Sequence, residues 1–300
     1  MKFFIRHKFI TIILIIFSGY VYLNYTKPVA INSYIDKTNI NYTNDLYMSD
    51  ARIYSNFLNV SEKKMYLTLF DNIKKRETEI IIDYNKSNCL TKDACYSMFL
   101  NAHDALLSDH PELLSYATFS SNSEAGKTII RLEYAIPISV LELIGIERIE
   151  RIIDEIKIAT KDMSDKEKIK YVYTWIGLNN KYDTYFTYAS KNQSAYNVFM
   201  HHNAVCSGFA KASQIIFQNI GIESYAVIGY STGHHMWNIV KLDGKYYNYD
   251  STVPTGRTVD DENFYLGLQS EFMETYKLTY PKWYPPVETA AMGIDYKITK

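Results

Sequence analysis

The sequence predicts an α+β fold in which a helix carrying a cysteine packs on an antiparallel sheet carrying a histidine and an aspartate. Residues 207–220 place apolar side chains on one helical face, so a helix is expected to start at Cys206 and to end at Gly221. Residues 236–250 are strand-like on both sides of Asp243-Gly244, a strong signal for a two-residue hairpin turn. These two elements form the core of the prediction.

Length and composition are those of a globular protein with one large or two small domains. The chain has 300 residues, of which 47% are hydrophobic, enough for a sizeable core. Its formal net charge of -1 gives no excess of positive charge for binding phosphates, so no nucleic-acid partner is expected.

Residues 1–25 are interpreted as a signal-anchor segment. Basic residues precede an apolar stretch from Phe9 to Leu23, and no small-x-small cleavage site follows it. This pattern favours an uncleaved membrane anchor over a cleaved secretory signal. Either one places the remainder outside the cytoplasm, anchored to the membrane or secreted, with the polar residues 26–48 as a tether.

Residues 49–140 are predicted to form a helper domain. The expected elements are a helix with a possible break near Asn59, a strand, a second helix and a second strand, over residues 51–76, 79–84, 93–107 and 128–136. This region carries no catalytic pattern, so we expect it to pack against the rest or to position substrate.

Residues 141–285 are predicted to form the catalytic domain. Helical spacing returns over residues 147–158. Ser164 and Glu167 form a capping box that predicts a helix running to about Leu178. A polar and aromatic loop is expected after it.

The three cysteines are expected to divide into a pair and a free thiol. Cys89 and Cys95 are close in sequence, and in an exported chain they can close a small loop by a disulfide. The alternative is two reduced, buried cysteines. Cys206 is then left without a partner, and it is the candidate nucleophile, because helix N-terminal amides and the macrodipole favour a thiolate. Its own amide can donate to a developing oxyanion. Taken alone, Cys206 is better explained as a small buried hydrophobe.

The hairpin turn predicts which side chains meet. If Leu242 pairs with Lys245, then Asp250 lies opposite Trp237, and His235 is its diagonal neighbour on the same face. A one-residue slip would separate them. Together with the helix-start cysteine, this placement predicts a Cys-His-Asp acyl-transfer triad.

His235, Asp250 and Cys206 could also have structural roles or bind a metal. Singly, His235 and Asp250 have ordinary structural explanations, and Trp237 is expected in the core or as a wall of the site. A zinc site would draw on six side chains, namely His201, His202, Cys206, His234, His235 and Asp250. The spacing from His202 to Cys206 matches no common structural zinc pattern, and a lone cysteine is unusual for structural zinc, so we expect no metal and no cofactor.

Four stretches that contain or precede these residues follow one another in a recognisable order. They are Ser194-Ala195-Tyr196, Ala204-Val205-Cys206-Ser207-Gly208-Phe209-Ala210, His235-Met236-Trp237-Asn238-Ile239-Val240 and Gly244-Lys245-Tyr246-Tyr247-Asn248-Tyr249-Asp250-Ser251-Thr252. In sequence and spacing they resemble the transglutaminase-like superfamily of cysteine peptidases. The likeness extends back to about residue 164, through Tyr182-Asp183. More faintly, residues 50–140 resemble the helper region of bacterial members.

The resemblance implies a papain-like transglutaminase core preceded by a helical and strand helper region. It implies Cys206 as nucleophile, His235 as general base and then acid, and Asp250 as the group that orients the imidazole. The motifs do not specify a second oxyanion donor. We expect Tyr196 or Gln193 in that role, and Trp237 as a substrate-positioning side chain.

Members of this superfamily share a thioester intermediate and differ in what attacks it. We expect an extracytoplasmic cysteine peptidase or amidase that acts on protein or peptide amides. One alternative is a protein-glutamine amine-transferring transglutaminase. Another is a non-catalytic binding or scaffolding domain, against which the complete triad argues.

Overall fold

The computed structural model describes residues 52–85, 89, 91–135, 139–184, 191–252, 265–267 and 276–288. The predicted signal-anchor and tether lie outside the described residues. From Ala51 to Lys300 the chain forms one compact unit. Within the described ranges, no helix combines the length and apolar character that a membrane crossing requires.

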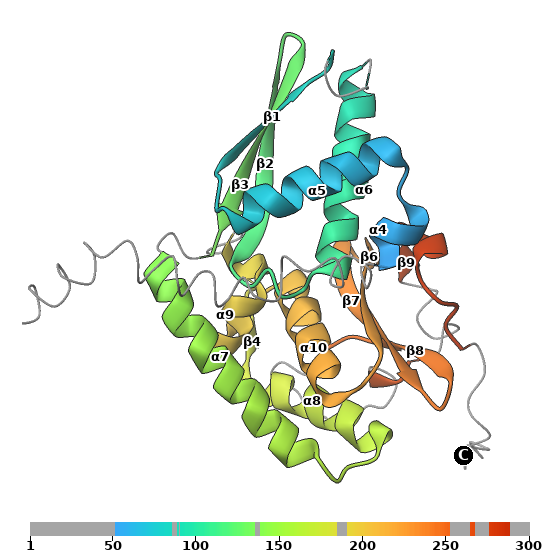
Figure 1. The fold of residues 1–300 in the computed structure, drawn as a ribbon. Coiled ribbons are helices and arrows are strands. Elements are labelled where there is room, and N and C mark those ends of the chain that lie inside the picture. Colours follow the sequence, from blue (N-terminus) through green and yellow to red (C-terminus); the bar gives the residue numbers. More distant parts are fainter. Residues whose placement is uncertain are drawn as a thin grey trace, which may run out of the picture. The chain divides into compact units, whose positions relative to one another are not determined.

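The helper region combines three helices with a three-stranded antiparallel sheet (Figure 1). The helices are α4 (Arg52–Phe57), α5 (Val60–Lys74) and α6 (Lys92–Asp109). The sheet order is β1-β3-β2, with β1 (Glu79–Asp83), β2 (Tyr116–Glu124) and β3 (Lys127–Tyr134). The break predicted near Asn59 is present, because Asn59 caps α5 by accepting hydrogen bonds from the amides of Ser61 and Glu62.

Strand β2 was not predicted from the sequence. Its second half is rich in Ser and Asn, which have low strand propensity. The strand forms because it pairs with β3 at both ends, Glu124 with Lys127 and Tyr116 with Tyr134, with a register shift between Tyr116 and Thr118. Tertiary pairing therefore overrides a weak local preference.

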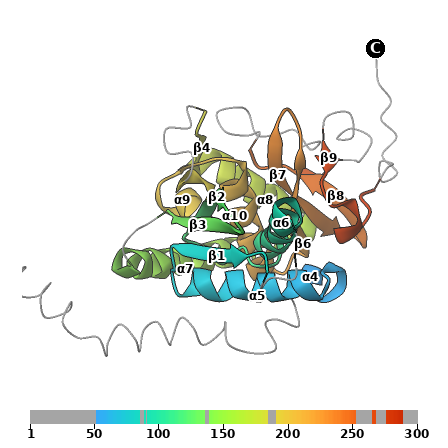
Figure 2. The same cartoon turned by 90° about the horizontal axis from the view of Figure 1, so that it is seen from above.

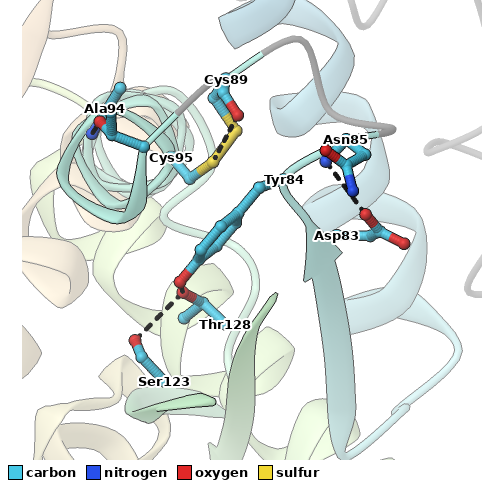
Figure 3. The surroundings of a disulfide bond; sticks show 9 residues. Asp83, Tyr84, Asn85, Cys89, Ala94, Cys95, Ser123 and Thr128 are labelled. Carbon is cyan, nitrogen blue, oxygen red and sulfur yellow. Dashed lines mark hydrogen bonds between the residues drawn. A yellow bond between two sulfur atoms is a disulfide. The ribbon is translucent and has the colours of Figure 1, made fainter. Parts of the chain in front are cut away.

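A disulfide joins Cys89 to Cys95 at the first turn of α6, the pairing expected from the sequence (Figure 3). Beside it, Tyr84 extends from the end of β1 toward the hairpin of β2 and β3, where its hydroxyl lies 3.0 Å from Oγ1 of Thr128. These two contacts tie α6 and the sheet to the connection between β1 and α6.

The predicted catalytic domain is built around α10 (Cys206–Ile220). Its other helices are α7 (Ser139–Thr160), α8 (Asp165–Asn179) and α9 (Ala195–Met200). Its four-stranded antiparallel sheet has the order β8-β7-β6-β9, with β6 (Ser224–Tyr230), β7 (His234–Leu242), β8 (Lys245–Tyr249) and β9 (Lys277–Leu278). Short segments complete it: β4 (Lys181–Tyr182), which pairs with β5 (Asn203–Ala204), and the 3₁₀ turns η2 (Lys191–Gln193) and η3 (Pro281–Trp283).

The helix boundaries follow the predicted caps. Ser164 and Glu167 form the capping box that starts α8. Gly221 ends α10 in the left-handed conformation, with φ of 80°. Helix α7 is longer than the predicted 147–158. It includes Gly145, which lies so close to the ring of Tyr196 that no Cβ would fit.

Helix α10 is buried between the sheet and the other helices (Figure 1). Its apolar face shares one hydrophobic core with α7, α8, α9 and the side of the sheet that carries Val240, Leu242 and Tyr249. The helper region contacts this core directly: α6 lies beside β6 in both views (Figure 2), and Nε2 of Gln214 in α10 donates to the carbonyl of Ser108 at 3.0 Å. The helix that carries Cys206 is thus held from several sides.

Candidate functional site

Cys206 is the first residue of α10 and the chain's one free cysteine. Its side chain is partly buried, and no side chain caps the helix in front of it. The amides of the first turn and the helix macrodipole therefore act on the thiol and favour its anionic form.

His235 and Asp250 meet through the hairpin as the predicted register requires. Leu242 pairs with Lys245, and positive φ angles at Asp243 and Gly244 form the tight turn. Nε2 of His235 lies 2.8 Å from Oδ2 of Asp250. Because Nε2 is bonded to the carboxylate, Nδ1 is the ring nitrogen left for the hydrogen bond between His235 and Cys206.

Asp250 is buried and densely hydrogen-bonded. The amide of Thr252 donates to Oδ1 at 2.9 Å and the hydroxyl of Thr252 at 2.6 Å, while the hydroxyl of Tyr276 donates to Oδ2 at 2.6 Å. Burial raises the pKa of Asp250. Its hydrogen bonds with His235, Thr252 and Tyr276 lower the pKa by more than burial raises it, so the pKa lies below its ordinary value. The carboxylate therefore stays ionised and orients the imidazole.

Cys206 and His235 shift one another's protonation. Burial raises the pKa of the Cys206 thiol, but the hydrogen bond and charge of His235 and the amide of Met236 lower it more, so the pKa falls below its ordinary value. Burial lowers the pKa of His235, yet bonds and charges from Asp250 and Cys206 raise it to about 10. The site therefore favours a thiolate beside an imidazolium.

Trp237 forms a wall behind the imidazole. Its ring stacks on His235 with centroids 5.9 Å apart, and Tyr276 stands edge-on to both rings. Nε1 of Trp237 donates to Asn248 at 3.0 Å, and the side chain is buried. The structure thus places Trp237 as a support of His235.

Tyr182 is a site residue that sequence reasoning missed. Its hydroxyl interacts with both the sulfur and the backbone amide of Cys206, and its ring stacks on Phe209 of α10. Burial, with a smaller effect of the charge of Cys206, raises the pKa of Tyr182 to about 12. The Tyr182-Asp183 pair is part of the resemblance to the superfamily, but no local pattern in the sequence indicates that the Tyr182 side chain reaches the thiol.

The two candidate oxyanion donors lie in different surroundings. Gln193 ends the η2 turn beside the start of α10, where Oγ of Ser207 lies 3.3 Å from its carbonyl and 3.5 Å from its Oε1. Tyr196 is buried with its ring against Gly145 of α7 and near His201. The geometry therefore favours Gln193 of these two.

The side chains considered as zinc ligands are not arranged as a metal site in the described residues. Across the ranges that the structure describes, no three His, Cys, Asp or Glu side chains lie together as a metal site would need. His201 and His202 are exposed, and the ring of His234 lies tilted against that of Tyr230 at the surface, with Nε2 3.2 Å from the tyrosine hydroxyl.

Comparison with known proteins adds an independent finding. Residues 155–251, which include Cys206, His235 and Asp250, match the family model of the transglutaminase-like superfamily. The chain is 26% identical to the kyphoscoliosis peptidase of Mus musculus and 25% identical to that of Homo sapiens, over 134 residues. Each match covers 39% of this chain and 20% of the relative.

A solved structure of a TGase is also similar, with 18% identity and a TM-score of 0.34 over 58% of this chain and 50% of the other. The family model matches the segment that contains α10 and the hairpin of β7 and β8. By this match, residues 155–251 form a transglutaminase-like domain.

Proposed function

We propose that this protein is a cysteine peptidase or amidase that cleaves protein or peptide amides through a thioester. The observation that carries the proposal is the Cys206 thiol at the start of α10, paired with His235, which is hydrogen-bonded to the buried Asp250. The match of residues 155–251 to the transglutaminase-like superfamily supports it, as does the peptidase name of the mouse and human relatives.

The chemistry proceeds in two halves. The thiolate of Cys206 attacks the amide carbonyl carbon, the C–N bond breaks, and the His235 imidazolium gives its proton to the departing amine. A thioester remains. Water then attacks the thioester while His235 takes its proton, the C–S bond breaks, and a carboxylic acid leaves with the thiolate restored.

We propose further that the reaction takes place outside the cytoplasm. The disulfide between Cys89 and Cys95 supports this location, because such bonds persist in oxidising compartments. The basic and apolar pattern of residues 1–25 supports attachment to the membrane.

A single assay separates the possible outcomes. The purified full-length chain in mild detergent is offered a glutamine-containing peptide library with a labelled primary amine. We expect backbone cleavage or ammonia release that is absent in Cys206→Ala. Dominant incorporation of the labelled amine would indicate an amine-transferring transglutaminase instead. A wild-type protein that neither reacts with these peptides nor forms an acyl-enzyme with an activated ester would fit a binding domain.

A further inference from the structure

Lys211 is a buried cation inside the nucleophile helix. It lies in α10, and only 2% of its surface is exposed. Its Nζ donates to the backbone carbonyl of Gln193 at 3.0 Å and lies 6.0 Å from the ring centre of Tyr116 in β2. Within the part of the chain that the structure describes, no carboxylate oxygen lies within 4.0 Å of this nitrogen.

This placement is costly for a residue with only a packing role. Removing an ammonium from water costs several kcal/mol unless a partner compensates for the lost hydration. A methionine would fill similar space without that cost. Burial lowers the pKa of Lys211 to about 8, while the charge of Cys206 acts in the opposite direction. The carbonyl that Lys211 holds therefore needs a functional explanation.

That carbonyl belongs to a turn docked on the start of α10. The amide of Val205 donates to the carbonyl of Asn192 at 3.0 Å. Ser207, next to the nucleophile, contacts both the carbonyl and Oε1 of Gln193. The side-chain amide of Gln193 also carries Nε2, a hydrogen-bond donor. The contact of Ser207 with Oε1 therefore orients Nε2 as well.

We propose that Lys211 is a positioning residue: by holding the Gln193 carbonyl from inside α10, it fixes the Gln193 side chain beside Cys206 as a donor to the oxyanion of acylation. This inference rests on the proposed function. It assigns the second oxyanion donor to Gln193 and gives the buried lysine a role in the reaction without direct contact to the substrate.

The test compares two reactions of the same thiol in the full chain. Acylation by p-nitrophenyl acetate passes through an oxyanion, whereas alkylation by iodoacetamide needs only the thiolate. We expect Lys211→Met to slow single-turnover acylation by about 10–100-fold, up to the range of losing one oxyanion donor. The alkylation rate is expected to change by less than about twofold, since the charge of Lys211 acts on Cys206 only at a distance.

A double-mutant cycle distinguishes positioning from general loosening of the fold. Gln193→Ala should slow acylation at least as much as Lys211→Met, and the double variant should be no slower than Gln193→Ala alone. Rates are measured on purified protein whose folding is verified by circular dichroism, so that unfolded molecules do not contribute. If the methionine variant does not fold, Lys211→Gln serves in its place, because its shorter side chain stays polar but cannot span the same distance.

Each contrary outcome has a distinct meaning. Equal losses of acylation and alkylation would show that Lys211 acts on the thiolate, and additive losses in the cycle would show a structural role. Either result overturns the proposal, as does unchanged acylation in Lys211→Met. If wild-type protein fails to acylate at all, the proposed function fails first and the role of Lys211 with it.

Discussion

At the scale of single residues, the chemistry depends on how Asp250 is held. A buried carboxylate is costly unless hydrogen bonds replace its lost hydration. Thr252 and Tyr276 supply such bonds to an aspartate that is 1% exposed. Because these donors keep the charge on Asp250, the imidazolium form of His235 is stabilised, and that cation in turn stabilises the thiolate.

The three triad side chains are expected to differ in importance. Cys206→Ala should abolish acyl-enzyme formation, because the site offers no other thiol. His235→Ala should lower single-turnover acylation by about 10²–10⁴-fold, the usual size of general acid-base assistance. Asp250→Asn should retain more activity, because an amide can still hold the imidazole.

The measurement is acylation by an activated ester across the purified, folded variants. Asp243→Asn is a matched control, because it removes a carboxylate from the hairpin turn at a positive φ that asparagine tolerates. It should behave as wild type. Wild-type acylation by Cys206→Ala would exclude the proposed nucleophile.

The pH dependence of the thiol follows from the same pair. Alkylation of Cys206 should rise with pH through a midpoint below the ordinary thiol value of about 8.5, because its pKa is lowered. Acylation should rise likewise and then fall as His235, with its pKa raised to about 10, loses its proton. In Asp250→Asn the pKa of His235 loses its main support, so the alkaline limb should move to lower pH.

This pH dependence is tested by measuring the iodoacetamide rate and the single-turnover acylation rate from about pH 5 to about pH 11. The range spans the ordinary and the shifted pKa values of both groups. An alkylation midpoint above about 8.5 would contradict an activated thiolate.

At the scale of elements, the start of α10 is pressed against the η2 turn. Gly208 makes this approach possible: an added Cβ would lie 2.9 Å from the carbonyl oxygen of Ser194 and 3.1 Å from that of Asn192. These are backbone atoms, which cannot rotate away as a side chain would. The distance between Cys206 and the Gln193 turn is therefore set by a residue without a side chain.

Gly208→Ala should increase the distance between Cys206 and the η2 turn that contains Gln193. We expect a loss of roughly 1–3 kcal/mol in the free energy of unfolding, typical of overpacking, together with at least a tenfold loss of acylation rate. Urea denaturation and single-turnover acylation measure the two effects.

Gly221→Ala is the control at the opposite end of the same helix. No atom lies within 4 Å of its added Cβ, but its positive φ makes alanine unfavourable, by about 1 kcal/mol. It should lose stability and keep its acylation rate. Equal activity losses in both glycine variants would show that activity follows stability alone.

At the scale of the whole molecule, the predicted helper domain contains a disulfide, and the predicted catalytic domain contains a free cysteine. Cys89 and Cys95 are paired beside α6, whereas Cys206 is free at the start of α10. The two regions also contact one another through α6 and α10, as in the bond from Gln214 to Ser108. The helper region therefore supports the helix that carries the nucleophile.

Thiol labelling should report this division directly. In native, non-reduced protein, iodoacetamide should modify Cys206 and leave Cys89 and Cys95 unlabelled. After reduction and unfolding, all three should react. Peptide mapping by mass spectrometry provides the measurement, and native labelling of Cys89 and Cys95 equal to that of Cys206 would contradict the disulfide.

What the sequence determined by itself is what local chemistry controls. The capping box at Ser164, the helix stop at Gly221 and the turn at Asp243-Gly244 each depend on residues within a few positions of one another. Because side chains alternate along a strand, the turn alone set the register that brings His235 to Asp250.

Only the tertiary structure decided which distant side chains complete the site. Tyr182 and Tyr276 reach Cys206 and Asp250 from other segments, and Lys211 reaches the η2 turn from within its helix. A hydroxyl or ammonium aimed across a core leaves no periodic or local pattern in the sequence. Strand β2 likewise exists because β3 pairs with it. Such features depend on the packing of elements that are far apart in the chain, and that packing is expressed only when the chain has folded.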